Sequence, residues 1–211
     1  MTQDARLYAP ATARNRAPIL DVLRCYLPSR GLVLEVASGS GEHTAHFAQS
    51  SGPDLIFQPS DSDPRARASI DAWTIALKLG NVRPAIALDA TSERWPISYA
   101  DIVLCINMIH IAPWTAAAGL MRGAASALPT SGILFLYGPF RRGGRHTAPS
   151  NEAFDRDLRT RDPAWGVRDL EAVVELAEAH GFAKPVVAEM PANNLSLTFR
   201  RAVSIAAEHL F

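Results

Sequence analysis

The stretch Leu32–Ala48, LVLEVASGSGEHTAHFA, combines the residue types of a nucleotide-binding turn. A short apolar run leads into small residues, and a helix-like pattern follows them. Glycines placed after a strand let the backbone approach a ligand closely, because no Cβ stands in the way. We therefore predict that this turn contacts a nucleotide-like cofactor through four residues: Ala37, Ser38, Gly39 and Gly41.

Departures from the dinucleotide fingerprint indicate which cofactor is expected. The pattern G-x-G-x-x-G requires a third glycine, and Thr44 stands at that position. Glu42 also places a negative charge at the start of the following helix, where a pyrophosphate would otherwise bind. S-adenosylmethionine (SAM) carries no phosphate, so this acid disfavours NAD more than SAM. We predict SAM as the cofactor and S-adenosylhomocysteine as its product.

Carboxylates end the first three strand-like runs, at Glu35, Asp61 and Asp89. Open α/β sheets bind ligands at the carboxyl ends of their strands, so these acids are expected at one edge of the sheet. Asp61 lies twenty residues beyond Gly41, a spacing that suits hydrogen bonds from ribose hydroxyls. Asp63 precedes Pro64 and is assigned to helix capping instead.

The segment CINMIHIAPW carries two polar residues, Asn107 and His110, inside an apolar run. Buried amides and imidazoles need hydrogen-bond partners. Asn107 is therefore a candidate to contact the cofactor or the substrate nucleophile, and His110 is a candidate base or substrate-orienting group. The alternative for His110 is a hydrogen bond to the loop that follows. Met108 is expected to pack against the adenine.

The elements that must position these residues alternate along the chain. Apolar runs predict strands at 32–36, 55–61, 84–90, 100–109 and 133–140, and helical spacing predicts helices at 17–27, 42–49, 64–79, 114–128 and 167–180. Two further strands, 185–191 and 195–201, are joined by a link too short for a parallel crossover. This pattern predicts one α/β domain over residues 1–211: a doubly wound, Rossmann-like sheet of five parallel strands plus an antiparallel C-terminal pair, with helices on both faces.

Composition narrows the classes of partner. The 211 residues include 21 basic and 21 acidic side chains, and this neutrality disfavours nucleic acid as a partner. Cys25 and Cys105 lie far apart without metal-ligand spacing, so buried free thiols and no metal are expected. The start of the chain lacks a signal-peptide pattern, and no apolar run approaches ~20 residues, which predicts a cytoplasmic protein without a membrane span. The sequence does not predict an oligomeric state.

Several segments together resemble one family. They are YAPATARNRAPIL, LEVASGSGEHTAHFA, FQPSDSD, INMIHIAPW, the stretch from LYGPF to WGVRD, and MPANNLSLTFRR. From about Tyr8 to Arg201 the chain resembles the DUF938 family, also called UPF0585. The resemblance implies a class I SAM-dependent methyltransferase fold and names no substrate.

The resemblance to methyltransferases also implies roles for the strand-end acids. Glu35 would face the amino-acid or ribose part of SAM, and Asp89 with Ala90 would hold the adenine. The alternatives are a Glu35 that is solvated or satisfies turn amides, and an Asp89 that makes an Asx turn.

The family-specific segments supply candidates for the substrate pocket. Segment 1–30 would cap the cofactor mouth, and segment 141–166, with its glycines and arginines, is interpreted as a lid. The alternatives are a solvated helix face, a solvated loop and, at the C-terminal hairpin, turn geometry. The candidates are Tyr8, Asn15, Arg16, Tyr137, Phe140, Arg145 and Asn194.

The leading hypothesis is methyl transfer from SAM to an unidentified small-molecule acceptor. A SAM-binding scaffold without turnover is the second hypothesis, and it would lack an open pocket beside the methyl group. An NAD-dependent oxidoreductase is the third, disfavoured by Thr44 and Glu42.

Overall fold

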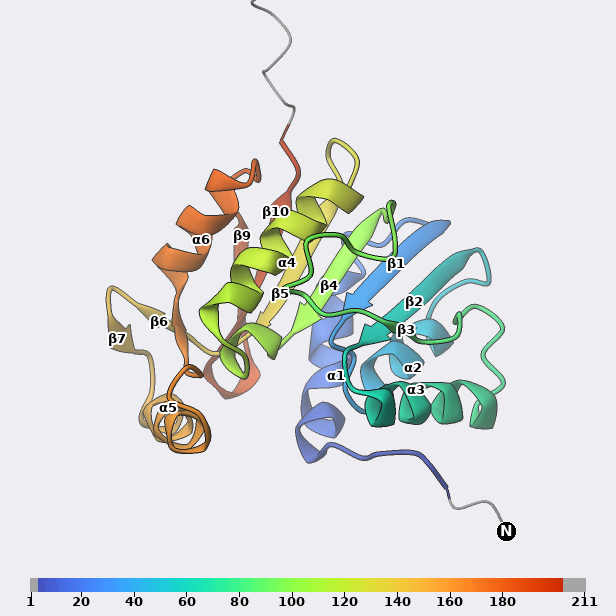
Figure 1. Ribbon diagram of the computed structural model, residues 1–211, viewed down its shortest axis with the longest axis horizontal. Helices are drawn as coiled ribbons and strands as arrows, with labels where there is room; N and C mark the ends of the chain where they lie inside the picture. Colours follow the sequence, from blue (N-terminus) through green and yellow to red (C-terminus); the bar gives the residue numbers. More distant parts are fainter. Residues whose placement is uncertain (1–3, 203–211) are drawn as a thin grey trace, which may run out of the picture.

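The computed structural model describes residues 4–202; residues 1–3 and 203–211, which belong to the predicted domain, lie outside the described part. A seven-stranded, mostly parallel sheet runs through the molecule, with helices on both faces (Figure 1). The helices are α1 (Pro10–Leu23), α2 (Glu42–Gln49), α3 (Pro64–Ala76), α4 (Trp114–Ala127), α5 (Pro149–Arg161) and α6 (Leu170–Ala179), with 3-10 turns η1 (Met108–His110) and η2 (Pro191–Asn193). The strands are β1 (Gly31–Val36), β2 (Leu55–Asp61), β3 (Ile86–Ala87), β4 (Ile102–Ile106), β5 (Ile133–Gly138), β6 (Phe140–Arg142), β7 (Arg145–His146), β8 (Arg168–Asp169), β9 (Val186–Met190) and β10 (Asn194–Arg200).

The strand order is β3-β2-β1-β4-β5-β10-β9. Parallel pairing links β3 through β5, and β10 runs antiparallel to both of its neighbours. After β3, at one edge of the sheet, the chain returns to form β4 on the other side of β1, so the strand order reverses between β1 and β4. The carboxyl ends of these two strands therefore open a crevice at the topological switch point, where α/β sheets bind their ligands.

Two apolar cores hold the sheet between its helices. Ile19 and Leu23 of α1 and Phe47 of α2 pack on one face, and α4 and α6 cover the other. All five residues of β4 are buried, which explains why this central strand reads as a continuous apolar run. The α/β class with a mostly parallel sheet is thus confirmed.

Some elements differ from the prediction. Helix α1 starts at Pro10 and contains Pro18, whereas its apolar spacing indicates only the later turns. The third strand shrinks to the two residues of β3. A small second sheet, β7-β6-β8, and the helix α5 occupy segment 141–166 and its flanks. Gly143 and Gly144, both at positive φ, make the tight turn between β6 and β7.

Cys25 is exposed, in contrast to the prediction, because α1 ends before it; Cys105 is buried in β4 as expected. Within residues 4–202 no helix is long and apolar enough to cross a membrane.

Candidate functional site

The turn between β1 and α2 takes its shape from residues with left-handed backbone. Ala37, Gly39 and Gly41 have φ values of 57°, 57° and 87°. A Cβ on Gly41 would lie 2.7 Å from the Cα of Ile70, so this glycine allows α3 to pack against the turn. A Cβ on Gly39 would meet nothing within 4 Å. Gly39 therefore borders open space, while Gly41 serves packing.

A cavity of about 490 Å³ lies beyond this turn, at the carboxyl ends of β1, β2 and β4; we call it the switch-point cavity. Apolar side chains such as Leu88 and Ile106 form much of its wall. It brings together six of the residues predicted to bind the cofactor: Ala37, Gly39, Asp61, Asp89, Ala90 and Met108.

Asp61 and Asp89 are the charged side chains of the switch-point cavity, and its described lining contains no Lys or Arg. Asp61 Oδ2 accepts a hydrogen bond from the Gly39 amide at 2.9 Å, which fixes the acid against the turn. Asp63 caps α3, and its side chain accepts from the Arg65 amide at 2.8 Å. The predicted capping role of Asp63 is therefore confirmed.

Asp89 makes the Asx turn that was the alternative to adenine binding. Its Oδ1 accepts from both the amide and the hydroxyl of Thr91, each at 2.8 Å. The side chain is exposed and still borders the switch-point cavity.

Glu35 and Ser38, which were predicted to contact the cofactor, lie beneath the turn and outside the lining of the switch-point cavity. Glu35 is 2% exposed, and the Thr44 hydroxyl donates to its Oε2. Ser38 Oγ donates to the Glu35 carbonyl at 3.2 Å and accepts from the Ser60 amide at 3.2 Å. Burial raises the pKa of Glu35 to about 7. Both side chains therefore support the turn from below.

Glu42 occupies the first turn of α2, where a phosphate would be expected to bind. Its buried Oε2 accepts from the Ala9 amide at 2.6 Å and from the Ser40 hydroxyl at 2.9 Å. The carboxylate therefore places a negative charge of the chain itself in the first turn of α2 and fastens the segment before α1 to the turn.

A second cavity of about 360 Å³ adjoins the first; we call it the amide cavity after Asn15, Asn107, Asn151 and Asn194, which line it. Tyr137 also lines it, so Asn15, Tyr137 and Asn194 of the predicted substrate set meet here.

The two cavities share one wall. Ile106 and Met108 border the switch-point cavity, whereas Asn107 between them borders the amide cavity. Asn107 adopts a φ of 62°, which turns the chain at the end of β4. Ile111 lines both cavities. Asn107 therefore lies on the amide-cavity side of this wall and not among the residues of the switch-point cavity.

His110 is fully buried and lines neither cavity. Its Nδ1 accepts from the Arg168 amide at 3.3 Å, and its ring packs edge-on to Phe140 at 4.9 Å. Burial lowers its pKa to about 3, so the ring is neutral. This burial away from both cavities does not support a catalytic base, and the ring bonds to the backbone of β8 at Arg168 rather than to the loop that follows His110.

The other predicted substrate residues lie elsewhere. Tyr8 is 63% exposed and packs against Trp73 of α3 with ring centroids 5.1 Å apart. Phe140 is fully buried in the core, and Arg145 is exposed in the β6–β7 hairpin. Arg16 is half-buried and outside both linings. The polarity or size of these four residues favoured a place in the substrate pocket. The direction of each side chain, however, depends on the fold.

Ser150, Asn151 and Phe154 of α5 line the amide cavity and were missed from the sequence. They lie in the stretch from LYGPF to WGVRD that resembles the family, and a polar helix in that stretch gives no sign of the cavity that it faces. Arg168 was missed as well. Its guanidinium donates to the carbonyls of Ile109 at 2.9 Å and Ala112 at 2.7 Å, and so fixes the wall that the two cavities share.

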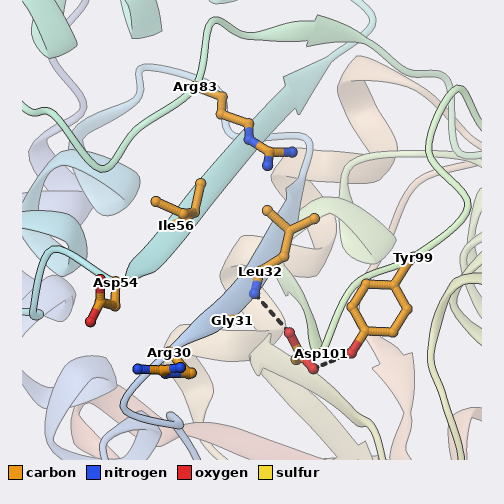
Figure 2. Close-up of a pocket in the computed structure, with 8 residues that line it drawn as sticks. All are labelled: Arg30, Gly31, Leu32, Asp54, Ile56, Arg83, Tyr99 and Asp101. Carbon is orange, nitrogen blue, oxygen red and sulfur yellow. Dashed lines mark hydrogen bonds between the residues drawn. The ribbon is translucent and has the colours of Figure 1, made fainter.

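A further cavity, of about 670 Å³, lies at the opposite end of the strands from the switch-point cavity (Figure 2). Arg30, Asp54 and Arg83 border it near the amino ends of β1 and β2. Both carboxylate oxygens of Asp101 in this cavity already accept hydrogen bonds, one from the Leu32 amide at 2.7 Å and one from the Tyr99 hydroxyl at 2.5 Å. The lining of this cavity contains none of the predicted site residues. In the described part of the chain no three His, Cys, Asp or Glu side chains gather as a metal site.

Solved structures of similar fold include methyltransferases. An O-methyltransferase family protein from Burkholderia thailandensis matches with a TM-score of 0.76 and 19% identity, over 92% of this chain and 58% of that one. An O-methyltransferase family 2 protein from Planctomyces limnophilus, in complex with apigenin, matches with 0.75 and 18%, over 91% and 60%. A structure described as PigF with SAH matches with 0.74 and 16%, over 89% and 56%. The chain thus has a methyltransferase fold and spans under two thirds of the length of these structures.

The family is shown by the sequence itself. Residues 6–201 match the model of DUF938, described as a protein of unknown function. The chain belongs to the DUF938 family, as its motifs indicated.

Proposed function

We propose that the protein is a SAM-dependent methyltransferase that binds SAM in the switch-point cavity and a small-molecule acceptor in the amide cavity. The observation that carries the proposal is a cavity at the switch point with two carboxylates, no cation in its described lining and a wall shared with a second cavity.

The charge of the switch-point cavity favours SAM over NAD. Asp61 and Asp89 suit a ligand with a positive sulfonium and with hydroxyl and amino donors, and they repel a pyrophosphate. Glu42 also places a negative charge in the first turn of α2, which disfavours a phosphate there. Gly39 leaves room for close approach of the ligand, and Met108 supplies an apolar surface for a base.

When bound, SAM supplies an electrophilic methyl group: the acceptor's lone pair bonds to the methyl carbon, the carbon–sulfur bond breaks with its electrons left on sulfur, and the acceptor's proton passes to water. The chain contributes position rather than acid–base chemistry. Tyr137 is the single titratable side chain in the described lining of the amide cavity, and burial raises its pKa. Asn107 and Ile111 hold the acceptor against the shared wall, and orientation of this kind supplies much of a methyl-transfer rate.

The amide cavity favours turnover over the scaffold hypothesis. A SAM-binding scaffold needs no space beside the cofactor, whereas here a cavity of about 360 Å³ adjoins it. Three of its lining residues come from α5, inside segment 141–166, and this supports the interpretation of that segment as a lid over the acceptor.

Calorimetric titration with SAM, S-adenosylhomocysteine and NAD tests the proposal. We expect micromolar binding of the first two and a loss of about tenfold or more with Asp61→Asn. The Asp61 carboxylate accepts from the Gly39 amide at one oxygen and from the Asp63 amide at the other, whereas Asn has a single acceptor oxygen and offers the ligand no negative charge. Asp63→Asn is the matched control, since Asn caps helices as well as Asp does. Binding of NAD alone, or equal affinity in both variants, contradicts the assignment.

A further inference from the structure

On the side formed by α5 and the C-terminal hairpin, the amide cavity presents amide oxygen atoms, whereas Asn15, whose Oδ1 pairs with His43 Nε2 at 2.8 Å, retains its Nδ2. Asn151 is 5% exposed and donates both of its amide hydrogens to the chain: Nδ2 bonds to Thr147 Oγ1 at 3.1 Å and to the Asn193 carbonyl at 2.9 Å. A carbonyl only accepts hydrogen bonds, so the orientation of this amide is fixed. Its Oδ1 bonds to no donor within residues 4–202 and remains for the cavity.

Asn194 repeats this arrangement from the C-terminal hairpin. Its Nδ2 donates to the carbonyls of Pro191 at 3.0 Å and Ala192 at 3.3 Å. Both amide hydrogens again serve the backbone of the hairpin, which leaves Oδ1 as the acceptor. Two amide oxygens with their orientation set by backbone carbonyls therefore border one cavity.

The same cavity has no group that would neutralise an anion. Its described lining contains no Lys, Arg, Asp or Glu. Arg145, a residue predicted for the substrate pocket, is exposed on β7 and outside the lining. A carboxylate placed beside Asn151 and Asn194 would face two amide oxygens, and the described lining has no cation to neutralise it, so its burial there would be unfavourable.

The rim of the cavity is apolar and exposed. Phe154 of α5 is 37% exposed and Ile111 is 41% exposed, and both line the cavity. Pro139 adds a further apolar surface. Large apolar side chains that are left uncovered at a cavity mouth suit the face of a ring, on which Phe154 can stack.

We propose that the acceptor is an uncharged ring compound with two or more O–H or N–H groups, which Asn151 and Asn194 bind through their oxygens while Phe154 and Ile111 cover the ring. The proposal rests on the function proposed above and specifies its substrate class. Every acceptor with an O–H or N–H group carries the proton that methyl transfer must release, so recognition and reactivity involve the same kind of group.

The test uses three ring compounds of similar size: resorcinol with two hydroxyls, 1,3-dimethoxybenzene with none, and 3-hydroxybenzoate with a carboxylate. Saturation-transfer NMR measures the affinity of each, with and without S-adenosylhomocysteine. We expect resorcinol to bind about tenfold more tightly than either analogue, because each analogue leaves an amide oxygen unpaired or repelled.

Two variants localise the binding. Phe154→Ala removes an exposed ring and is expected to weaken resorcinol about fivefold or more. Ile75→Ala, at a position 76% exposed on α3, is the control and should change nothing. Asn151→Leu should reduce the preference for resorcinol over the dimethoxy compound.

The inference is overturned if resorcinol does not bind, if the dimethoxy compound or the carboxylate binds equally well, or if Phe154→Ala has no effect. Failure of the function itself gives a different result. Binding of S-adenosylhomocysteine without the preference overturns only the acceptor class, whereas the preference without that binding supports the cavity chemistry and contradicts methyl transfer.

Discussion

Glu35 connects the glycine turn to the pH dependence of folding. Its carboxyl is 2% exposed beneath the turn, and burial raises its pKa from 4.5 to about 7. One pKa unit corresponds to about 1.4 kcal/mol, so the ionised carboxyl is less stable in the native state than in the unfolded chain by about 3 kcal/mol. Glu35→Gln keeps an oxygen for the Thr44 hydroxyl and removes the ionisation.

The sign follows from proton uptake. Between pH 4.5 and about 7 the native state holds a proton on Glu35 that the unfolded chain has lost, so stability falls as pH rises through this window. His43 and His110 act in the opposite sense, because burial lowers both pKa values to about 3 and the unfolded chain takes up their protons below about 6.5. These histidines are present in both proteins and cancel in the difference.

Urea unfolding at pH 4.5 and at pH 8 measures the effect. The Glu35→Gln variant should gain about 3 kcal/mol relative to the natural sequence between the two values. Glu93→Gln, at an exposed position, is the control and should show no such gain. A parallel pH dependence in the Glu35→Gln variant and the natural sequence would refute the argument that this acid is buried and protonated.

Three further predictions concern the turn, the shared wall and the thiols. Gly41→Ala should unfold more readily by about 1–3 kcal/mol, because its Cβ would meet the backbone of α3, whereas Gly39→Ala should mainly weaken S-adenosylhomocysteine binding in calorimetry. Arg168→Leu should cost about 2–4 kcal/mol in urea unfolding, because buried carbonyls lose their donor, and Arg142→Ala at an exposed ion pair should cost under about 1 kcal/mol. With a thiol reagent at pH 8 Cys25 should react in the native protein and the cysteine of β4 only after unfolding; equal rates would contradict the burial.

Local patterns in the sequence predicted the elements that build the switch-point cavity. The apolar run of β4, the glycines after β1 and the Asp–Pro start of α3 each depend on neighbours along the chain, and each lies where expected. Asp61 and Met108 reach the cavity for this reason, since both follow directly from a strand end.

The amide cavity depends on contacts that the sequence does not display. Asn151 bonds to the carbonyl of Asn193, a partner 42 residues away, and only the fold brings α5 to that hairpin. His110 and Phe140 fit a pocket by residue type, yet they pack against each other in the core. Glu35 precedes the turn by two residues, but its side chain faces Thr44 on the buried side. The position of a residue at a strand end therefore predicted that it lies at the carboxyl edge of the sheet. It did not predict on which side of the glycine turn the side chain lies.

The partition formed by residues 106–111 has a thermodynamic consequence. Ile106 and Met108 touch one compartment, Asn107 touches the other, and Ile111 touches both. An occupant that displaces this partition changes the free energy of its neighbour's binding, and linkage requires the two effects to be equal. Arg168 bonds to carbonyls within and just beyond this segment. It therefore limits how far the partition can move and, with it, the size of the coupling between the two cavities.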